Sequence, residues 1–303
     1  MTCRVGGVTP KCCAAALLPN HPGTSAIELK RDRNHMIEQA YETLAISETE
    51  DAPGVVEIAM NRPQARNAMN TQMMLDLRDC FQSYYVAPDA ARCLILTGVG
   101  DLAFCAGADL KERNGMDDAD WRRQHAIVEQ AIRAIMMCPV PVIAAVNGAA
   151  FAGGCELALS CDFVLASDNA RFAQTEVRLG IIPGAMGTQN LPRAIGLRRA
   201  KQVILSGQAF DCADAEAWGL VNTRYETVEN LRAGARDVAR AIASNAPIAV
   251  RQAKAAIGKS ADLDRANGYD YEIEAYNRTV PTDDRIEGIA AFNEKRAPKF
   301  SGQ

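Results

Sequence analysis

Apolar residues recur along the chain with two different spacings. From about residue 42 to residue 195, short apolar runs bounded by glycine, proline or polar residues alternate with longer segments whose apolar positions follow the helical period. Because strands and helices that alternate in sequence tend to pack as a parallel sheet covered by helices, residues 42–195 are predicted to form an α/β core. The predicted strands are GVVEIAMNRP (54–63), RCLILTG (92–98), PVPVIAAVNG (139–148) and CDFVLAS (161–167).

Helical spacing accounts for most of the remaining pattern. Within the core it predicts helices over 71–85 and near 117–137. After residue 195 it continues through further segments that begin with capping residues, so residues 196–303 are predicted to form a helical region behind the core. These segments start at residues 197, 213, 227, 247 and 262.

The first 41 residues have a different composition and are predicted to be a leader. Residues 1–27 contain two basic residues, Arg4 and Lys11, and no acidic residue precedes Glu28. This is compatible with a mitochondrial transit segment. The glycines and prolines of the segment would break the amphipathic helix that a transit segment needs, so a disordered leader without function is the alternative. The expected location is mitochondrial, with the cytoplasm as the alternative.

Composition and charge narrow the class of protein. The 303 residues are 48% hydrophobic and 23% charged, which suits a globular chain with an ample core. No apolar run approaches the roughly 18 residues that a transmembrane helix needs, so no membrane span is expected. The net charge of -4 comes from interleaved acids and bases and gives no sign of a nucleic-acid or anionic-membrane partner.

Cysteine and histidine indicate neither a disulfide framework nor a metal site. The ten cysteines include no C-x-x-C pair, and several lie inside apolar runs, as is typical of reduced core thiols. There are only three histidines, and no metal ion is expected. His125 shares a helical face with Trp121 and Val128, so packing within the helix is the preferred interpretation of this residue.

Two loops each place small residues directly after a buried strand, which for the first loop is the short run LAFC (102–105). They are AGA at 106–108 and GG at 153–154, and a helix is expected to begin at the second. A helix start has unpaired N–H groups, and small side chains let a ligand oxygen approach the backbone. Together the loops could supply the two donors of an oxyanion hole. For either loop alone, tight packing of a helix against a strand explains the small residues equally well.

Two glutamates follow these loops. Glu156 occupies the first turn of the expected helix, and Glu176 comes after the next strand. A short helix running away and a strand running back would bring both carboxylates to one rim, although the spacing alone does not require it. Two carboxylates beside one ligand suit general acid–base chemistry. Taken singly, Glu156 could act only as a partner of the helix dipole.

Three blocks of the sequence resemble the signature blocks of the enoyl-CoA hydratase/isomerase (crotonase) superfamily. They are FCAGADLKER (104–113), VNGAAFAGGCELALSCD (146–162) and TEVRLGIIPGAMGTQ (175–189). The resemblance covers about residues 45–300 and includes NRPQARNAMN (61–70) and the C-terminal VPTDDRIEGIAAFNEKRAPKF. Several independent blocks in the family order make it specific. Among the branches, the chain is most similar to the methylglutaconyl-CoA hydratase-like group.

The resemblance implies a fold, an assembly and a catalytic site. The implied fold is a spiral of strand-strand-helix repeats, with C-terminal helices that make trimer contacts and with hexamers built as dimers of trimers. The backbone N–H groups of Ala108 and Gly153 would hold the thioester carbonyl of an acyl-CoA. Glu156 and Glu176 match the two catalytic glutamates of the hydratases, and Gly184 falls where the family lines the water site.

The resemblance also implies contacts with coenzyme A, which is part of the substrate, and no separate cofactor. Lys295 matches a contact with a CoA phosphate across a subunit boundary, with a solvated charge as the alternative. The positions that match CoA and pantetheine contacts, largely through backbone, are Ala65, Arg66, Ala68, Ala106, Asp109 and Leu110.

Three positions depart from the family pattern. Ala152 stands where many members have a third glycine, which would narrow the backbone next to the oxyanion hole. Met186 interrupts a glycine-rich run, where it would either reshape the acyl pocket or fill the core. Asn190 replaces a frequent arginine.

The presence of both glutamates favours an enoyl-CoA hydratase, with 3-methylglutaconyl-CoA as one candidate substrate. Isomerases of this superfamily generally keep only the glutamate that matches Glu176, so isomerisation or other acyl-CoA chemistry is the alternative. RNA binding has been described for the methylglutaconyl-CoA hydratase branch through a lysine-rich helix. The matching segment, 71–92, has no lysine and carries three aspartates against two arginines, so RNA binding is not favoured. Retention of both glutamates also argues against a silent scaffold.

Overall fold

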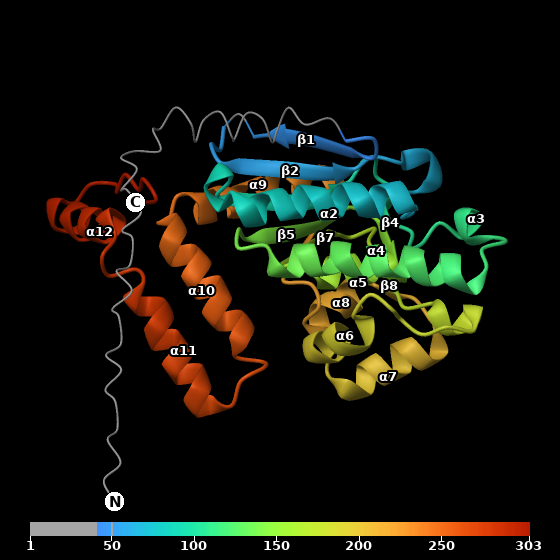
Figure 1. The fold of residues 1–303 in the computed structure, drawn as a ribbon. Coiled ribbons are helices and arrows are strands. Elements are labelled where there is room, and N and C mark those ends of the chain that lie inside the picture. The colour runs from blue at the N-terminus through green and yellow to red at the C-terminus, as the bar shows by residue number, and fades with distance from the viewer. Residues whose placement is uncertain (1–40, 50) are drawn as a thin grey trace, which may run out of the picture.

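The computed structural model describes residues 41–49 and 51–303. The predicted leader therefore lies, apart from its last residue, outside the described residues. Two β-sheets and the helices around them make up the described chain (Figure 1). None of the helices in this part of the chain is long and apolar enough to cross a membrane.

The larger sheet has six strands in the order β1-β2-β3-β5-β7-β10. β1 is antiparallel to β2, and the other neighbouring pairs are parallel. The predicted α/β core with a mainly parallel sheet is thereby confirmed. The strands are β1 (Leu44–Glu48), β2 (Val55–Met60), β3 (Cys93–Gly98), β5 (Val142–Val146), β7 (Phe163–Ser167) and β10 (Thr223–Tyr225).

Helices cover both faces of this sheet. One face packs against α2 (Thr71–Val86) and α4 (Asp118–Met137), and the other packs against α9 (Val228–Ala243). Because side chains alternate along a strand, Leu94 of β3 belongs to the first core and Ile95 to the second. Burial on both faces explains why the predicted strands are apolar almost throughout.

A smaller sheet of short strands lies beside the larger one, in the order β4-β6-β8-β9. In chain order, β3, β5 and β7 of the larger sheet are each followed by β4, β6 and β8 of the smaller sheet, and then by helical segments. This order is the strand-strand-helix repeat that the family resemblance implies, so the predicted spiral fold is confirmed. The strands are β4 (Ala103–Cys105), β6 (Ala149–Phe151), β8 (Arg171–Ala173) and β9 (Phe210–Asp211).

Helical segments follow the strands of the smaller sheet, and some of them begin with a side-chain cap that the sequence provides. Asp109 caps the helix α3 (Leu110–Arg113), and Asp117 caps α4 by accepting hydrogen bonds from two backbone N–H groups. The predicted start of a helix near residue 117 is therefore confirmed. The remaining helices before α9 are η1 (Pro63–Ala65), η2 (Pro88–Ala90), α5 (Gly153–Leu159), η3 (Glu176–Leu179), α6 (Gly187–Ile195), α7 (Leu197–Ser206) and α8 (Cys212–Trp218).

The region after residue 195 is less uniform than the prediction of a helical region over 196–303. It contains β9 and β10, and β10 pairs in parallel with β7 as an edge strand of the larger sheet. β10 has only three residues, which are too few to produce a recognisable strand pattern in the sequence. It is identified as a strand by its pairing with β7. The helices that extend away from the sheets in Figure 1 are α10 (Pro247–Lys259), α11 (Arg265–Asn277) and α12 (Asp283–Glu294).

The seven cysteines of the described chain are all unpaired, and six of them are buried. Burial raises the pKa of the Cys155 thiol, which lies inside α5, to about 12. These residues are therefore protonated core thiols, as their apolar surroundings in the sequence predicted.

Candidate active site

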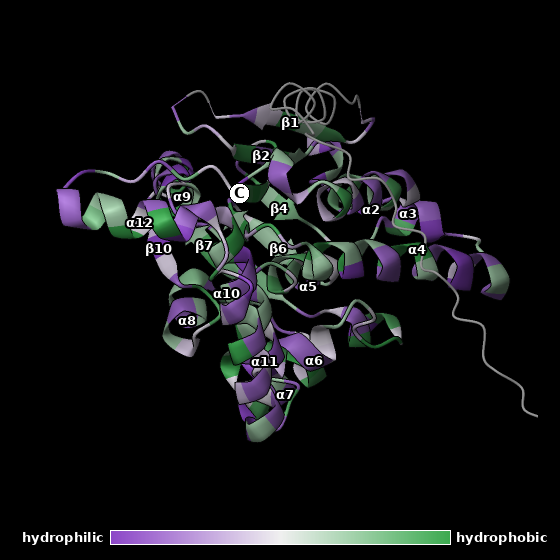
Figure 2. Ribbon diagram, turned by 60° about the vertical axis from the view of Figure 1, so that its left-hand side comes forward, coloured by the Kyte–Doolittle hydropathy of each residue, from purple (hydrophilic) through white to green (hydrophobic). Residues whose placement is uncertain are grey.

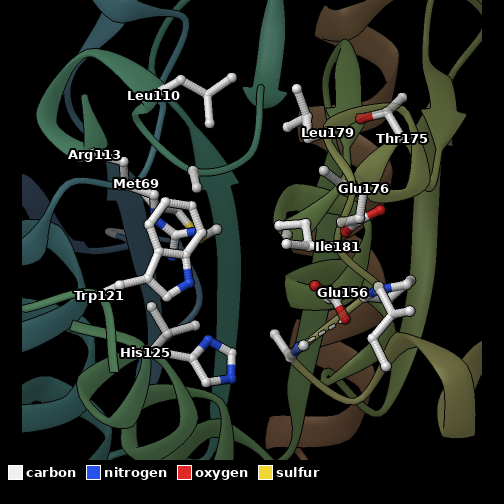
Figure 3. A pocket seen from close by; sticks show the side chains of 18 of the residues that line it. Met69, Leu110, Arg113, Trp121, His125, Glu156, Thr175, Glu176, Leu179 and Ile181 are labelled. Atoms are coloured by element: carbon white, nitrogen blue, oxygen red, sulfur yellow. Dashed lines mark hydrogen bonds between the residues drawn. The ribbon is translucent and has the colours of Figure 1, made fainter. Parts of the chain in front are cut away.

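A cavity of about 730 Å³ lies between two walls of the described chain (Figure 3). One wall comes from α3 and α4 and includes Trp121 and His125. The opposite wall is the segment 175–185, which follows β8. Between the walls, the loops after β4 and β6 contribute Ala108 and Gly153. Blocks far apart in sequence are thus brought to one cavity by the repeats of the fold.

Glu156 lies in the first turn of α5 and reaches this cavity. Its Oε1 accepts hydrogen bonds from the backbone N–H groups of Ala185 and Gly187, each at 2.8 Å. A Cβ at position 187 would come within 2.7 Å of Oε1, so glycine is needed for this approach. The side chain is only 3% exposed, and burial raises its pKa in spite of the two N–H donors. The Oε2 atom remains available to a ligand.

Glu176 begins η3, lies on the same side of the cavity as Glu156 in Figure 3, and is 6% exposed. Burial, and to a smaller extent the negative charge of Glu156, together raise its pKa to about 7. The amide of the fully buried Gln174, oriented with its nitrogen toward Glu176, donates to Oε1 and Oε2 at 3.1 and 3.2 Å. The two carboxylates predicted to meet are therefore neighbours at one cavity.

Two backbone N–H groups in the same cavity have no hydrogen-bond partner among the described residues. They belong to Ala108, in the loop after β4, and to Gly153, the first residue of α5. A Cβ at position 153 would lie 2.2 Å from Met69 Cε, so the end of the Met69 side chain would have to move to make room for it. A Cβ at position 154 would lie 2.0 Å from the carbonyl oxygen of Cys105. Both interpretations of the GG pair thus apply, since Gly153 presents a donor and Gly154 permits close packing.

Ala152, just before this donor, has backbone angles of φ 50° and ψ −122°. L-residues rarely adopt a positive φ, so this alanine holds a conformation that favours glycine. Met186 also has a positive φ, of 74°, but its side chain packs against the main core and is not part of the cavity lining. Of the two interpretations of Met186, core filling is the one that the structure supports.

The residues predicted to contact CoA fall into two groups. Ala106, Leu110 and Gly184 line the cavity. Asp109 forms an ion pair with Arg62 at 3.0 Å. Asp109 does not line the cavity, and neither does the turn at 65–68. The Arg66 carbonyl of this turn accepts a hydrogen bond from the Ala106 N–H, so the turn is attached to the cavity edge through backbone.

Lys295 ends α12 and is not among the residues that line the cavity. In Figure 1, α12 lies at the opposite side of the chain from α3 and α4. Lys295 is therefore remote from the cavity of its own chain, and its contact with a CoA phosphate across a subunit boundary stays a prediction.

His125 differs from its predicted role as a packed helix residue. It lines the cavity, and its ring lies against Gly184, where a Cβ would come within 2.5 Å of His125 Cε1. Trp121 and Arg113 line the same wall and were not predicted as site residues. The helical period placed Trp121 and His125 on one face but did not show that this face borders a cavity. Gln174 was also missed, because only the fold places it beside Glu176.

The site combines a buried pair of carboxylates with two unpaired backbone N–H groups, which is the arrangement of an acid–base site for a carbonyl compound. It is suited to polarise a carbonyl group and to move protons at the neighbouring carbons. Within residues 41–49 and 51–303, no group of three or more His, Cys, Asp or Glu side chains is arranged to hold a metal ion.

The chain belongs to the enoyl-CoA hydratase/isomerase family, whose profile matches residues 50–303. It is 41% identical over 253 residues to the enoyl-CoA hydratase domain-containing protein 2, mitochondrial, of Mus musculus, covering 82% of this chain and 85% of the relative. It is 37% identical over 257 residues to the methylglutaconyl-CoA hydratase, mitochondrial, of Homo sapiens, covering 84% and 76%.

A solved structure shares both the fold and much of the sequence. The enoyl-CoA hydratase from Bacillus anthracis superposes with a TM-score of 0.83 at 40% identity, over 86% of this chain and all of that chain. The predicted membership of the crotonase superfamily and the predicted fold are thereby confirmed.

Proposed function

We propose that the protein is an enoyl-CoA hydratase, which adds water across the 2,3 double bond of a 2-enoyl-CoA. The observation that carries this proposal is the meeting of Glu156 and Glu176 with the free N–H groups of Ala108 and Gly153 in one cavity. The names of the relatives described above support the same activity. CoA belongs to the substrate, and the proposal involves no separate cofactor.

The two N–H groups would bind the thioester carbonyl oxygen. When hydroxide adds to C3, negative charge moves onto this oxygen as an enolate-like state forms. Donors that are already in position stabilise that state more than the ground state, and each is typically worth about 3 to 4 kcal/mol. The small residues at 106–108 and 152–154 let the oxygen come close to the backbone.

The surroundings of the two glutamates support different roles. Glu156, held at Oε1 by two N–H donors, would take a proton from water with its Oε2. Glu176, with a pKa raised to about 7 by burial and then by Glu156, is protonated in a large fraction of molecules near neutrality. It would supply the proton to the α carbon. Two neighbouring carboxylates do not readily ionise together, which helps to keep one of them protonated.

The CoA portion would lie at the edge of the cavity that carries Leu110. Residues 65–68, Ala106 and Asp109 would contact it, largely through backbone. Lys295 would reach a CoA phosphate only from a second subunit. We propose a homotrimer, or a hexamer of two trimers, because apolar side chains remain exposed on α11 and α12. The ribbon of α12 carries green, hydrophobic segments in Figure 2.

The proposed location is mitochondrial. The leader composition and the word mitochondrial in the names of two relatives support it. Imaging of a C-terminal fluorescent fusion, with and without residues 1–41, tests this location. A cytoplasmic signal from the full-length fusion would support the alternative.

The activity is tested by following the loss of the conjugated enoyl-thioester absorbance of crotonyl-CoA. The wild type should hydrate crotonyl-CoA, and Glu156→Gln and Glu176→Gln should each lose about a hundredfold or more in kcat, the range typical of general acid–base groups. Glu229→Gln, which changes an exposed glutamate of α9, is the matched control and should retain wild-type activity.

The proposal is contradicted if the folded wild type hydrates neither crotonyl-CoA nor 3-methylglutaconyl-CoA. Retained hydration in either variant would contradict the assigned role of that glutamate. Migration of the double bond in place of water addition would support the isomerase alternative.

A further inference from the structure

Two residues beside the hydrogen-bonding backbone of the site have a positive φ although neither is glycine. Ala152 directly precedes the Gly153 donor, and its φ is 50°. Met186, with a φ of 74°, lies between the two residues whose N–H groups hold Glu156. A positive φ is unfavourable for an L-residue and persists only where the surrounding structure enforces it. The hydration mechanism itself needs no side chain at either position.

The backbone of Ala152 sets the direction of the first donor. The peptide between residues 152 and 153 carries the Gly153 N–H, and its orientation depends on the ψ angle of Ala152, which is −122°. The carbonyl of this peptide accepts from the N–H groups of Cys155 and Glu156 at 2.9 and 3.1 Å. The Ala152 N–H donates to the Ala173 carbonyl at 2.8 Å. A change of these angles would therefore break hydrogen bonds on both sides of the residue.

The methyl group of Ala152 lies between the two loops that carry the donors. A Cβ added to Gly107 would come within 3.1 Å of the Cβ of Ala152, so this methyl group lies directly beside the backbone of the other loop. Gly107 is followed by Ala108, the second donor, and its own carbonyl accepts from the Met69 N–H at 2.8 Å. Glycine at position 152 would remove the contact between the loops and give the backbone more freedom.

Met186 has the corresponding position beside Glu156. The Gly187 N–H belongs to the peptide that follows Met186, and the carbonyl of this peptide accepts the first hydrogen bonds of α6, from Gln189 and Asn190, each at 2.9 Å. The Met186 side chain packs against the main core. The backbone on both sides of Met186 is thus fixed where its N–H groups converge on Glu156 Oε1, each at 2.8 Å.

We propose that Ala152 and Met186 are positioning residues whose side chains hold the neighbouring backbone N–H groups in the directions that hydration uses. An L-residue has few allowed backbone conformations, whereas glycine at the same position could rotate the peptide into several others. Donors that need no rearrangement stabilise the charge that develops on the thioester oxygen best. This inference rests on the proposed hydratase function.

Ala152→Gly separates a positioning role from a merely structural one, because stability and activity should change in opposite directions. Removal of the side chain relieves the strain of the positive φ, so Tm should rise by roughly 2 °C. The kcat should nevertheless fall by about three- to tenfold with little change in KM, because the interaction is strongest in the transition state. The substrate is the better hydrated of crotonyl-CoA and 3-methylglutaconyl-CoA.

Ala246→Gly is the matched control. Ala246 is likewise the N-cap residue of a helix, α10, and makes no side-chain cap, but its φ is −60° and it does not line the cavity. The same chemical change should leave kcat unchanged there. It should not raise Tm, because no positive-φ strain is relieved.

Met186 is tested through its effect on Glu156. Met186→Gly should lower kcat by about three- to tenfold and move the acid limb of its pH profile upward, because a carboxylate with looser N–H donors is protonated more easily. Met186→Leu keeps an apolar side chain on the same backbone and should retain most of the wild-type kcat and profile. The other titratable groups of the cavity, among them Glu176 and His125, are the same in both variants. Thermal unfolding shows that each variant compared is folded.

Two outcomes would overturn the inference. The first is a wild-type kcat in Ala152→Gly, and the second is a wild-type kcat and pH profile in folded Met186→Gly. In both cases the wild type still hydrates its substrate, so the proposed function stands. A folded wild type that hydrates neither crotonyl-CoA nor 3-methylglutaconyl-CoA would instead overturn the proposed function, and the inference with it.

Discussion

Glu156 and Glu176 are both almost fully buried, but their immediate partners differ. Glu156 receives two backbone N–H groups on one oxygen, whereas Glu176 has the side-chain amide of Gln174. Burial raises the pKa of both, and that of Glu176 reaches about 7. A carboxyl group with a pKa near the working pH can release and regain a proton during turnover.

The pKa of Glu176 predicts how activity depends on pH. If Glu176 gives the proton to the α carbon, kcat should fall as pH rises through about 7, because the group is then ionised before the reaction. The measurement is the pH profile of kcat with saturating crotonyl-CoA. A kcat that stays level from pH 6 to about pH 8.5 would argue against Glu176 as the acid.

The same pKa has a consequence for stability. The folded-state pKa of about 7 lies above the ordinary value of 4.5, so the folded protein binds this proton more tightly than the unfolded chain does. The resulting stabilisation is fully present below about pH 4.5 and is lost as pH rises through about 7. It amounts to at most about 3 kcal/mol.

Glu176→Gln should remove this dependence. Between about pH 5 and pH 8, the free energy of unfolding from urea titrations should decline for the wild type relative to the variant. Glu229→Gln, the exposed control, should follow the wild type. Parallel curves for the wild type and Glu176→Gln would show that the folded-state pKa of Glu176 is not raised.

At the scale of single residues, the sequence predicted the groups that we propose to react but not the groups that surround them. Glu156, Glu176, Ala108 and Gly153 were expected to meet and do line one cavity. Gln174 could not be assigned, since a glutamine after an apolar run has no distinctive pattern. For His125, the helical period was correct but the inferred burial was wrong, because the face of α4 that carries it borders a cavity.

Among the elements, the contact between α5 and β4 determines where Glu156 and the Gly153 donor lie. Gly154 permits this contact, since a Cβ there would lie 2.0 Å from the carbonyl oxygen of Cys105, a backbone atom of β4. The backbone of a paired strand cannot move aside without a large cost in free energy. The helix must therefore shift if residue 154 carries a side chain.

Gly154→Ala should consequently destabilise the protein by about 2 kcal/mol or more and lower kcat, as overpacking in a close-packed core does. The measurements are the free energy of unfolding and crotonyl-CoA turnover. Gly258→Ala is the matched control, because Gly258 lies within α10 and a Cβ there would meet nothing within 4 Å. The control should stabilise the protein by about 0.5 to 1 kcal/mol.

If Gly154→Ala were as stable and as active as the wild type, the close approach of α5 to β4 would not be what positions the site.

The long elements could be predicted because their period is repeated several times. Among the short strands, β4 was expected from the run LAFC, but β6 and β8 could not be predicted, since three residues do not establish a period and their pairing depends on neighbouring strands.

For the whole molecule, the C-terminal helices present apolar side chains that the described part of the chain leaves exposed. Phe292 of α12 is 83% exposed, and neighbouring helices carry further exposed apolar side chains. Large exposed apolar surfaces are typical of protein–protein contacts. The residues are Ile257, Tyr269, Ile273, Tyr276, Ile286, Ile289 and Phe292.

Phe292→Glu should weaken the proposed trimer, because it would place a charge in a contact from which water is excluded. Light scattering coupled to size-exclusion chromatography should report a trimer or hexamer for the wild type and a smaller species for the variant. Val86→Glu, at an 82% exposed position at the end of α2, is the control and should leave the assembly unchanged. A monomeric wild type would contradict the proposed assembly.

The sequence by itself determined the α/β core, the family, the long helices and the residues that we propose to react. These depend on local period, capping and backbone freedom, which neighbouring residues carry. Only the tertiary structure decided that β10 completes the larger sheet, that Gln174 contacts Glu176, and that Trp121 and His125 border the cavity. Such contacts join residues distant in the chain, and their energies exist only once the sheets and helices have packed.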